Sequence, residues 1–228
     1  MDWVAGVDGC RKGWFVVVLG VDGSRVEQSQ HFLASTFADV LSWGKTHSAK
    51  AIAVDIPIGL LDTPKPGGRP CDKEARAILG RRGCTVFSPA VRAQLGAQTF
   101  EEAKALGSIT KQSFGILPKI AQVDAVLAAT EPRFVYEVHP EVSFAVMSGG
   151  QPMRNKKSAV GRAARAQAIA QALGPSLLQQ LNERPKGVGP DDFLDACAAA
   201  WTAVRIARGA AISLPRNASQ DVNTPIWA

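Results

Sequence analysis

The stretch VAGVDGCRKGWFVVVLGVDG (residues 4–23) decides the fold, because it places two apolar runs side by side with almost no chain between them. Residues 3–8 and 13–21 each have the apolar character of a buried strand. A DGS turn signal at 22–24 then leads into an alternating run at 25–33. Connections this short join antiparallel neighbours. The sequence therefore predicts a three-stranded antiparallel meander.

The rest of the chain alternates helices with strands. Apolar residues at helical spacing predict a helix at 36–46, and an apolar run predicts a buried strand at 51–58. The Pro-, Gly- and Arg-rich segment 61–118 is interpreted as an insertion of short helices and loops within a single domain spanning 1–228. Further elements are predicted as a helix at 119–130, a strand at 133–138 and helices at 156–173 and 190–209, with the last twenty residues expected as a tail over the surface.

Composition indicates an ordinary globular protein. The 228 residues carry a formal net charge of +6, and 46% of them are hydrophobic. The four cysteines form no CxxC pair and no His/Cys cluster, which disfavours a disulfide framework or a structural zinc site. No signal-peptide pattern precedes residue 4, and no apolar run reaches the length of a membrane helix. We therefore expect a cytoplasmic protein.

Each of three predicted strands carries one acidic residue at or near its end. These residues are Asp8, Asp55 and Glu137. Their same-face neighbours are mostly small, as at Gly6 and Ala53, which leaves room for acids to converge. Gly6 and Gly9 beside Asp8 are expected to let a cation and a phosphate approach the backbone closely.

The last predicted helix adds Asp192 and Asp195, which are three residues apart and share a helix face. Several buried carboxylates at one edge of a sheet repel one another unless a cation lies between them. Oxygen ligands suit Mg²⁺ or Mn²⁺. One or two ions are expected, because two ions about 3.5–4 Å apart support in-line phosphodiester hydrolysis. The alternative for any single Asp is a turn or a helix cap, and Asp192 in particular is placed to cap its helix.

Four segments in this order, GVDGCRKGW (6–14), AVDIPIGL (53–60), YEVHPEVSF (136–144) and DDFLDACAAAWTA (191–203), resemble a bacterial family of unknown function regarded as RNase H-like nucleases. The likeness covers residues 3–209. The helix segment is also similar to the last acidic motif of RuvC-type Holliday junction resolvases.

The resemblance implies an α/β fold with an RNase H-like five-stranded mixed sheet, in which three antiparallel strands are continued by parallel ones and flanked by helices. It implies a metal-dependent nuclease site. Asp8 would bridge the metals, with Asp55, Glu137 and Asp195 as further ligands and Asp192 as an additional catalytic acid. Position 55 is often Glu in the resolvases, and the role of Glu137 within its Glu-x-His-Pro segment is open.

Positive charge is concentrated in two windows, 65–92 and 154–165, each with a net charge of +5. Concentrated basic charge suits a phosphate-contacting surface. We name Lys12, Arg76 and Arg81 as candidate phosphate ligands, and His139 as a candidate for substrate contact or acid–base chemistry. The alternative for each arginine is a solvated surface or an ion pair with a nearby acid.

The sequence therefore favours a Mg²⁺- or Mn²⁺-dependent nuclease acting on DNA or RNA. Two alternatives stay open. One is a non-catalytic module that binds nucleic acid or a phosphorylated ligand. The other is a phosphotransferase of the actin-like fold, which normally needs two such domains.

Overall fold

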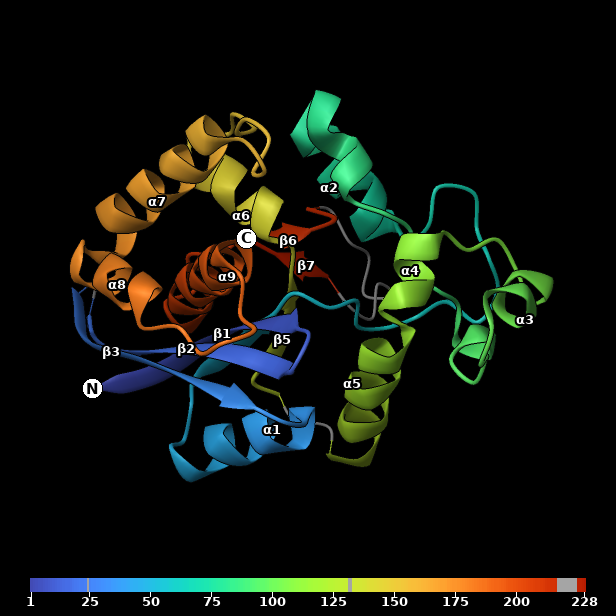
Figure 1. The fold of residues 1–228 in the computed structure, drawn as a ribbon, viewed down its shortest axis with the longest axis horizontal. Helices are drawn as coiled ribbons and strands as arrows, with labels where there is room; N and C mark the ends of the chain where they lie inside the picture. Colours follow the sequence, from blue (N-terminus) through green and yellow to red (C-terminus); the bar gives the residue numbers. More distant parts are fainter. Residues whose placement is uncertain (24, 131–132, 217–224) are drawn as a thin grey trace.

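A mixed β-sheet forms the centre of the computed structural model, which describes residues 1–23, 25–130, 133–216 and 225–228 (Figure 1). Within these residues the sheet has seven strands in the order β3-β2-β1-β4-β5-β7-β6. The first three strands are antiparallel, β4, β5 and β7 continue the sheet in parallel with β1, and β6 is antiparallel to β7. The strands are β1 (Asp2–Cys10), β2 (Gly13–Asp22), β3 (Arg25–Ala34), β4 (Ala51–Val54), β5 (Val135–Val138), β6 (Ser213–Leu214) and β7 (Ile226–Trp227).

This order confirms the RNase H-like arrangement of three antiparallel strands continued by parallel ones. The five expected strands are present, and two short strands extend the sheet beyond β5. The expectation of a surface tail is wrong for β6 and β7, because β7 pairs with β5 and Ile226 is buried. Residues 217–224, which belong to the same predicted tail, lie outside the described residues.

Helices cover both faces of the sheet (Figure 1). One face carries α1 and α5, and the other carries α9 with α6, α7 and α8 around it. The helices are α1 (Phe37–Thr46), α2 (Pro70–Leu79), α3 (Phe100–Ala105), α4 (Lys111–Gly115), α5 (Leu117–Thr130), α6 (Pro140–Met147), α7 (Ala159–Leu173), α8 (Ser176–Gln179) and α9 (Pro190–Ala207), and short 3-10 helices occupy Gly80–Thr85, Arg92–Gln94 and Gln180–Asn182.

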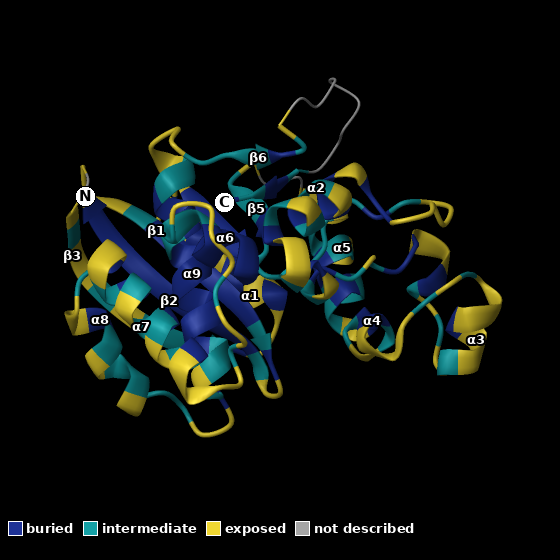
Figure 2. Cartoon of the chain, turned by 90° about the horizontal axis from the view of Figure 1, so that it is seen from above, coloured by how far each residue is buried: buried dark blue, intermediate teal, exposed yellow. Residues whose placement is uncertain are grey.

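Alternation along β2 builds the two halves of the core. Phe15 and Val17 belong to the cluster that packs with α9, whereas Trp14 and Val16 belong to the cluster under α1 and α5. Successive side chains of a strand point to opposite faces, so an uninterrupted apolar run is what a strand covered on both faces requires. Figure 2 shows this burial at the centre of the fold, where β2 and α9 are drawn as buried.

The helix α9 lies directly on the backbone of β1. A Cβ atom added at Gly6 would lie 2.0 Å from the backbone N of Ala200 and 2.2 Å from the backbone O of Ala196. Gly6 therefore makes room for a helix and not for a cation, contrary to the expectation from the sequence. Gly9 likewise makes room for the side chain of Lys119, whose Cδ would lie 2.7 Å from an added Cβ.

Segment 61–118 carries α2, α3, α4 and two of the 3-10 helices, and no strand is described within it. Its interpretation as an insertion stays a prediction. The helix α6 was not expected as a separate element. It begins at Pro140, directly after β5, and proline is well suited to the first turn of a helix. Among the described residues, no helix combines the length and the apolar character needed to cross a bilayer.

We predict that Gly6→Ala strongly destabilises the protein, because the new methyl group meets the backbone of α9 and cannot be relieved by a side-chain rotation. Overpacking of this kind costs about 1–3 kcal/mol and sometimes more. Chemical denaturation measures the free energy of unfolding. Gly115→Ala is the matched control, since an added Cβ there meets nothing within 4 Å. Equal stabilities of the two variants would contradict the close approach of α9.

Candidate active site

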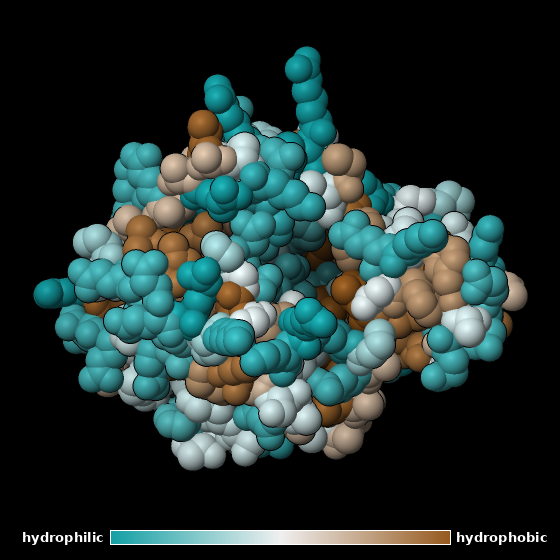
Figure 3. All heavy atoms as spheres, viewed as in Figure 1, coloured by the Kyte–Doolittle hydropathy of each residue, from teal (hydrophilic) through white to brown (hydrophobic). Residues whose placement is uncertain are grey.

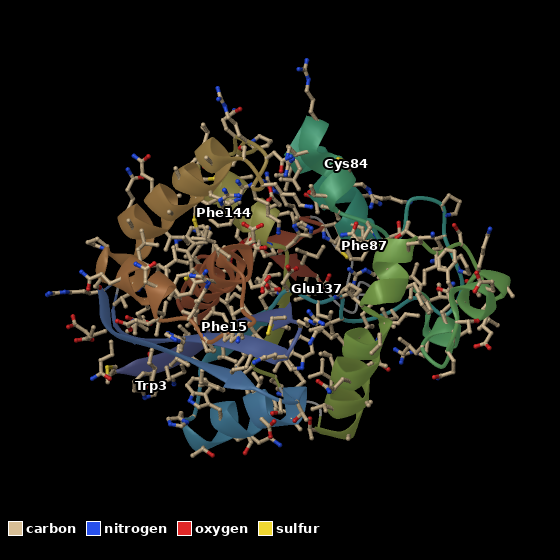
Figure 4. All side chains as sticks on the ribbon, in the orientation of Figure 1. Trp3, Phe15, Cys84, Phe87, Glu137 and Phe144 are labelled. Atoms are coloured by element: carbon tan, nitrogen blue, oxygen red, sulfur yellow. The ribbon has the colours of Figure 1, made fainter. Side chains whose placement is uncertain are left out.

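A cavity of about 380 Å³ opens at the carboxyl edge of the central strands. The ends of β1, β4 and β5, the beginning of α9, the segment 82–87 and the loop before α7 all contribute to its wall. Figure 3 shows a hollow near the middle of this face of the molecule, and Figure 4 places Glu137 near it, with Cys84 and Phe87 on the side of α2. The charged side chains that line the cavity are Asp8, Asp55, Arg69, Asp72, Arg82, Lys119, Glu137, Glu141, Lys156 and Asp195.

Three aspartates approach the cavity from the α9 side of the sheet. Asp8 lies on the face of β1 that carries Gly6, and Asp55 continues the face of Ala53, which packs with α9. The strand β4 ends at Val54, so Asp55 is the first residue beyond it. Its backbone N–H donates to the carbonyl of Val7 at 2.9 Å, which extends the parallel pairing and sets Asp55 beside Asp8.

Asp195 completes this group from the second turn of α9. Because Gly6 lets α9 lie directly on β1, the start of the helix reaches the end of the strand that carries Asp8. Asp8 and Asp195 are buried, with exposed fractions of 9% and 4%, and Asp55 is half-buried. The three residues are called the acidic cluster below.

The acidic cluster is electrostatically strained. Burial raises the pKa of Asp8 well above its usual value, and the nearby charges of Asp55 and Asp195 raise it further. Burial also raises the pKa of Asp55 and that of Asp195 to about 6 each, although Lys156 opposes both shifts. Mutual repulsion in a buried site is the condition under which a bound cation is most stabilising.

Lys156 is the cation that the structure places at this cluster. Its Nζ lies 2.5 Å from Oδ2 of Asp195. Burial alone would lower the pKa of Lys156, but Asp195, and to a smaller extent Asp55 and Asp8, raise it above the ordinary value. The other carboxylate oxygen of Asp195, Oδ1, is buried and has no hydrogen-bond partner among the described residues.

Glu137 faces the opposite side of the sheet. It pairs in register with Val54, which belongs to the core under α1 and α5, whereas Ala53 and Tyr136 face α9. Both oxygens of Glu137 are engaged by Arg69, at 2.5 Å to Oε1 and 2.7 Å to Oε2, and Oε2 also accepts the backbone N–H of Ile58 at 2.7 Å. Glu137 thus lines the cavity as the partner of a buried arginine.

Other buried acids at this edge are also paired. Asp72 accepts from Nη2 of Arg69 at 2.8 Å. Glu141 accepts from Nη2 of Arg165 with both oxygens, at 2.7 and 2.8 Å, and Arg82 lies 3.5 Å from Oε2. These ion pairs fix the wall of the cavity and leave the acidic cluster as the described carboxylates that share a single lysine.

Asp192 does not line the cavity. Its Oδ2 accepts the backbone N–H of Gly189 at 2.8 Å and so caps α9, which is the structural alternative that the sequence left open for this residue. Its charge nevertheless reaches the site, since it is one of the smaller contributions that raise the pKa of Asp8.

The structure brings one of the four predicted substrate-contacting residues to the cavity. His139 lines it, with Nε2 3.4 Å from the carbonyl of Thr85, and burial lowers its pKa. Arg76 instead donates to the carbonyls of Val86 and Gly67. Lys12 and Arg81 are exposed and lie outside the lining.

Besides Arg69, which is paired with Glu137 and Asp72, three cations line the cavity that were not named as ligands from the sequence: Arg82, Lys119 and Lys156. Lys119 donates to the carbonyl of Gly13 at 2.6 Å and lies 4.4 Å from the centre of the Trp14 ring. The basic windows pointed to Arg82 and Lys156 without singling them out. Lys119 carries no local signal, because it reaches the site only after α5 has packed against the sheet.

The donor set suits a divalent cation in its chemistry. The acidic cluster offers oxygen ligands, which Mg²⁺ and Mn²⁺ prefer, and the unpaired Oδ1 of Asp195 is a free donor at the cavity wall. Yet no three His, Cys, Asp or Glu side chains of the described residues are gathered as ligands of one ion. The residues therefore fit a metal in the chemistry of their donors, and Lys156 is the cation that contacts one of them, Asp195.

Comparison with known proteins bears on this site through the family and the fold. The family model "Protein of unknown function (DUF429)" matches residues 6–220. The chain belongs to the DUF429 family. The match spans all three residues of the acidic cluster as well as Lys156. A search of curated proteins finds no match to this DUF429 chain.

Two solved structures of RuvC are similar to this DUF429 protein, each at 16% sequence identity. One is T. thermophilus RuvC in complex with a Holliday junction substrate, with a TM-score of 0.43 over 92% of this chain and 98% of RuvC. The other is a Thermus thermophilus RuvC structure with a TM-score of 0.38 over 91% and 97%. With 16% sequence identity and TM-scores below 0.5, this similarity carries no conclusion about the reaction at the site.

We predict that Arg69→Met destabilises the protein by about 3–5 kcal/mol, because it leaves the buried carboxylates of Glu137 and Asp72 without their counter-charge. Urea denaturation gives the free energy of unfolding, and Arg81→Met is the control at an exposed arginine nearby. A loss no larger than that of the control would show that the Arg69 ion pairs do not hold the wall of the cavity.

Proposed function

We propose that this DUF429 protein is a divalent-metal-dependent nuclease that hydrolyses phosphodiester bonds in DNA or RNA. One observation carries the proposal. Asp8, Asp55 and Asp195 come from three distant parts of the chain and line one cavity, where their charges repel one another and cationic side chains also lie. Carboxylates beside cations at a sheet edge are what a site for metal and phosphate requires.

In this proposal Asp8, Asp55 and Asp195 hold the metal. A bound metal would supply Lewis-acid chemistry: it would lower the pKa of a water and neutralise charge on the phosphate. In hydrolysis the water oxygen bonds to phosphorus and the P–O bond to the departing sugar oxygen breaks. That oxygen keeps the electron pair and takes up a proton, while a proton of the attacking water is released. Glu137, predicted from the sequence as a ligand, positions Arg69 and the cavity wall instead.

Arg82, Lys119 and Lys156 are the proposed phosphate contacts. All three line the same cavity as the carboxylates, so a phosphodiester bound there would meet positive charge from the protein as well as from the metal. Lys119 is fixed at its ammonium by the carbonyl of Gly13, and fixed donors orient a substrate better than free ones.

The alternative function is a non-catalytic module that binds nucleic acid or a phosphorylated ligand. One observation favours it: among the described residues Lys156 already neutralises Asp195, and no three potential ligands are gathered around one point. In this case the acidic cluster and its lysine are a structural ion-pair network. The two functions differ in whether a divalent ion binds the folded protein.

We predict that the purified protein cleaves labelled single-stranded, double-stranded or junction nucleic acid in the presence of Mn²⁺, and that Asp8→Asn lowers the rate at least about 100-fold. Such a loss is the order expected when a group that stabilises the transition state is removed. Gel analysis of DNA and RNA substrates measures it. Asp62→Asn, at an acid whose side chain is 88% exposed, is the control that keeps the activity. Cleavage by Asp8→Asn at the rate of the control would refute the proposal.

We also predict that Mn²⁺ raises the melting temperature of the protein and that EDTA reverses the rise, because a ligand that binds only the folded state stabilises it. Asp195→Asn should reduce the rise, since it removes an anionic ligand at the cavity. Differential scanning calorimetry at fixed ionic strength measures the effect, with Ca²⁺ and Na⁺ as comparisons. A melting temperature that responds to no divalent ion would favour the binding module.

A further inference from the structure

We propose that the acidic cluster takes one divalent cation, and that the Lys156 ammonium supplies the second positive charge of the site. This inference rests on the proposed nuclease function. It differs from the sequence expectation of up to two ions, and it assigns to Lys156 a contact with the phosphate that the substrate presents.

Charge in the cavity is the first argument. The ion pairs already described remove Glu137, Asp72 and Glu141 from the set of available acids. With its three carboxylates ionised, the acidic cluster carries three negative charges, and Lys156 and Lys119, which line the same cavity, reduce the net charge to −1. One divalent ion changes that charge to +1, which a phosphodiester anion balances. A second ion would change it to +3, a buried positive charge that costs free energy unless it is compensated.

The contact geometry of Asp195 is the second argument. Lys156 occupies Oδ2 at 2.5 Å, whereas Oδ1 is buried without a hydrogen-bond partner in the described part of the chain. One carboxylate thus has one oxygen committed to an ammonium and one oxygen free for another cation. This arrangement is the one expected of a carboxylate that bridges two cations, with one oxygen bound to the ammonium and the other to the metal.

The loop that carries Lys156 is the third argument, because it is tied down on both sides of that residue. Nη1 of Arg165 donates to the carbonyl of Arg154 at 2.8 Å, and Oγ of Ser158 donates to the carbonyl of Asn155 at 2.7 Å. Gly161 packs against the same Asn155 carbonyl, which would lie 2.0 Å from a Cβ added there. The ammonium is therefore delivered to the acidic cluster by fixed backbone, while the adjacent Lys157 is exposed.

A fixed ammonium in this place does what a second ion would do for the substrate. Nζ of lysine carries three donors, and Asp195 uses one of them. Lys156 lines the cavity, and Asp195 is the one hydrogen-bond partner of its Nζ among the described residues, so two donors are left for a phosphate oxygen. Lys156 is then a catalytic residue in the strict sense, because it contacts the substrate. The acidic cluster holds its ammonium in place.

The test is the stoichiometry and affinity of Mn²⁺ binding to the full chain, measured by isothermal titration calorimetry and by electron paramagnetic resonance of free Mn²⁺. We expect one ion per wild-type chain. Lys156→Gln should bind its first ion about tenfold more tightly, because a positive charge close to the metal is gone, and should cleave nucleic acid more slowly. Lys157→Gln is the matched control and should behave as the wild type in both measurements.

Two bound ions per wild-type chain would overturn the inference and leave the proposed nuclease function intact. Equal Mn²⁺ affinity of Lys156→Gln and Lys157→Gln would do the same. No Mn²⁺ binding by the wild type or by any variant would instead remove the proposed function and the inference with it. If Lys156→Gln does not fold, the wild-type stoichiometry still decides, and Lys156→Arg, which keeps the charge, should retain one ion at near wild-type affinity.

Discussion

The contact of α9 with β1 at Gly6 is the constraint on which the rest of the structure depends. A helix that rests on the backbone of a strand, with alanines beneath it, has no freedom to slide or tilt. This fixes the beginning of α9 over the end of β1, and with it the distance between Asp195 and Asp8. The position of the candidate site is thus a consequence of the packing of α9 on β1, in the core directly beneath the cavity.

Around that contact, buried arginines divide the acids into two groups. Arg69 and Arg165 each donate two hydrogen bonds to one carboxylate, and the acids held in this way stabilise the wall of the cavity. The acids without an arginine share one lysine, whose ammonium is a compact point charge and does not grip a carboxylate through two parallel hydrogen bonds. The contrast between guanidinium and ammonium partners separates structural carboxylates from those that remain available for chemistry.

Much of the fold was predictable from the sequence, because the spacing of apolar residues and the shortness of the connections can be read locally. The meander and the helix from Pro190 were confirmed, and the strand predicted at 51–58 is present but ends at Val54, one residue before Asp55. The side of the sheet on which Glu137 lies was not predictable, since it depends on the register of β5 against β4. Lys119 and the pairing of Arg69 with Glu137 depend on contacts between residues far apart in the chain, which no local pattern encodes.

The position of β7 near the end of the described chain affects the order in which the sheet can form. It pairs with β5, from which it is separated by almost ninety residues, and Ile226 also lines the cavity. A ribosome releases the strands in chain order, so β1 to β5 and α9 have all emerged before this edge of the sheet can close. Until then β5 presents open hydrogen-bonding groups on the side where β7 will lie. The wall of the cavity is completed last, and the nascent chain passes most of its synthesis with the carboxylate edge unfinished.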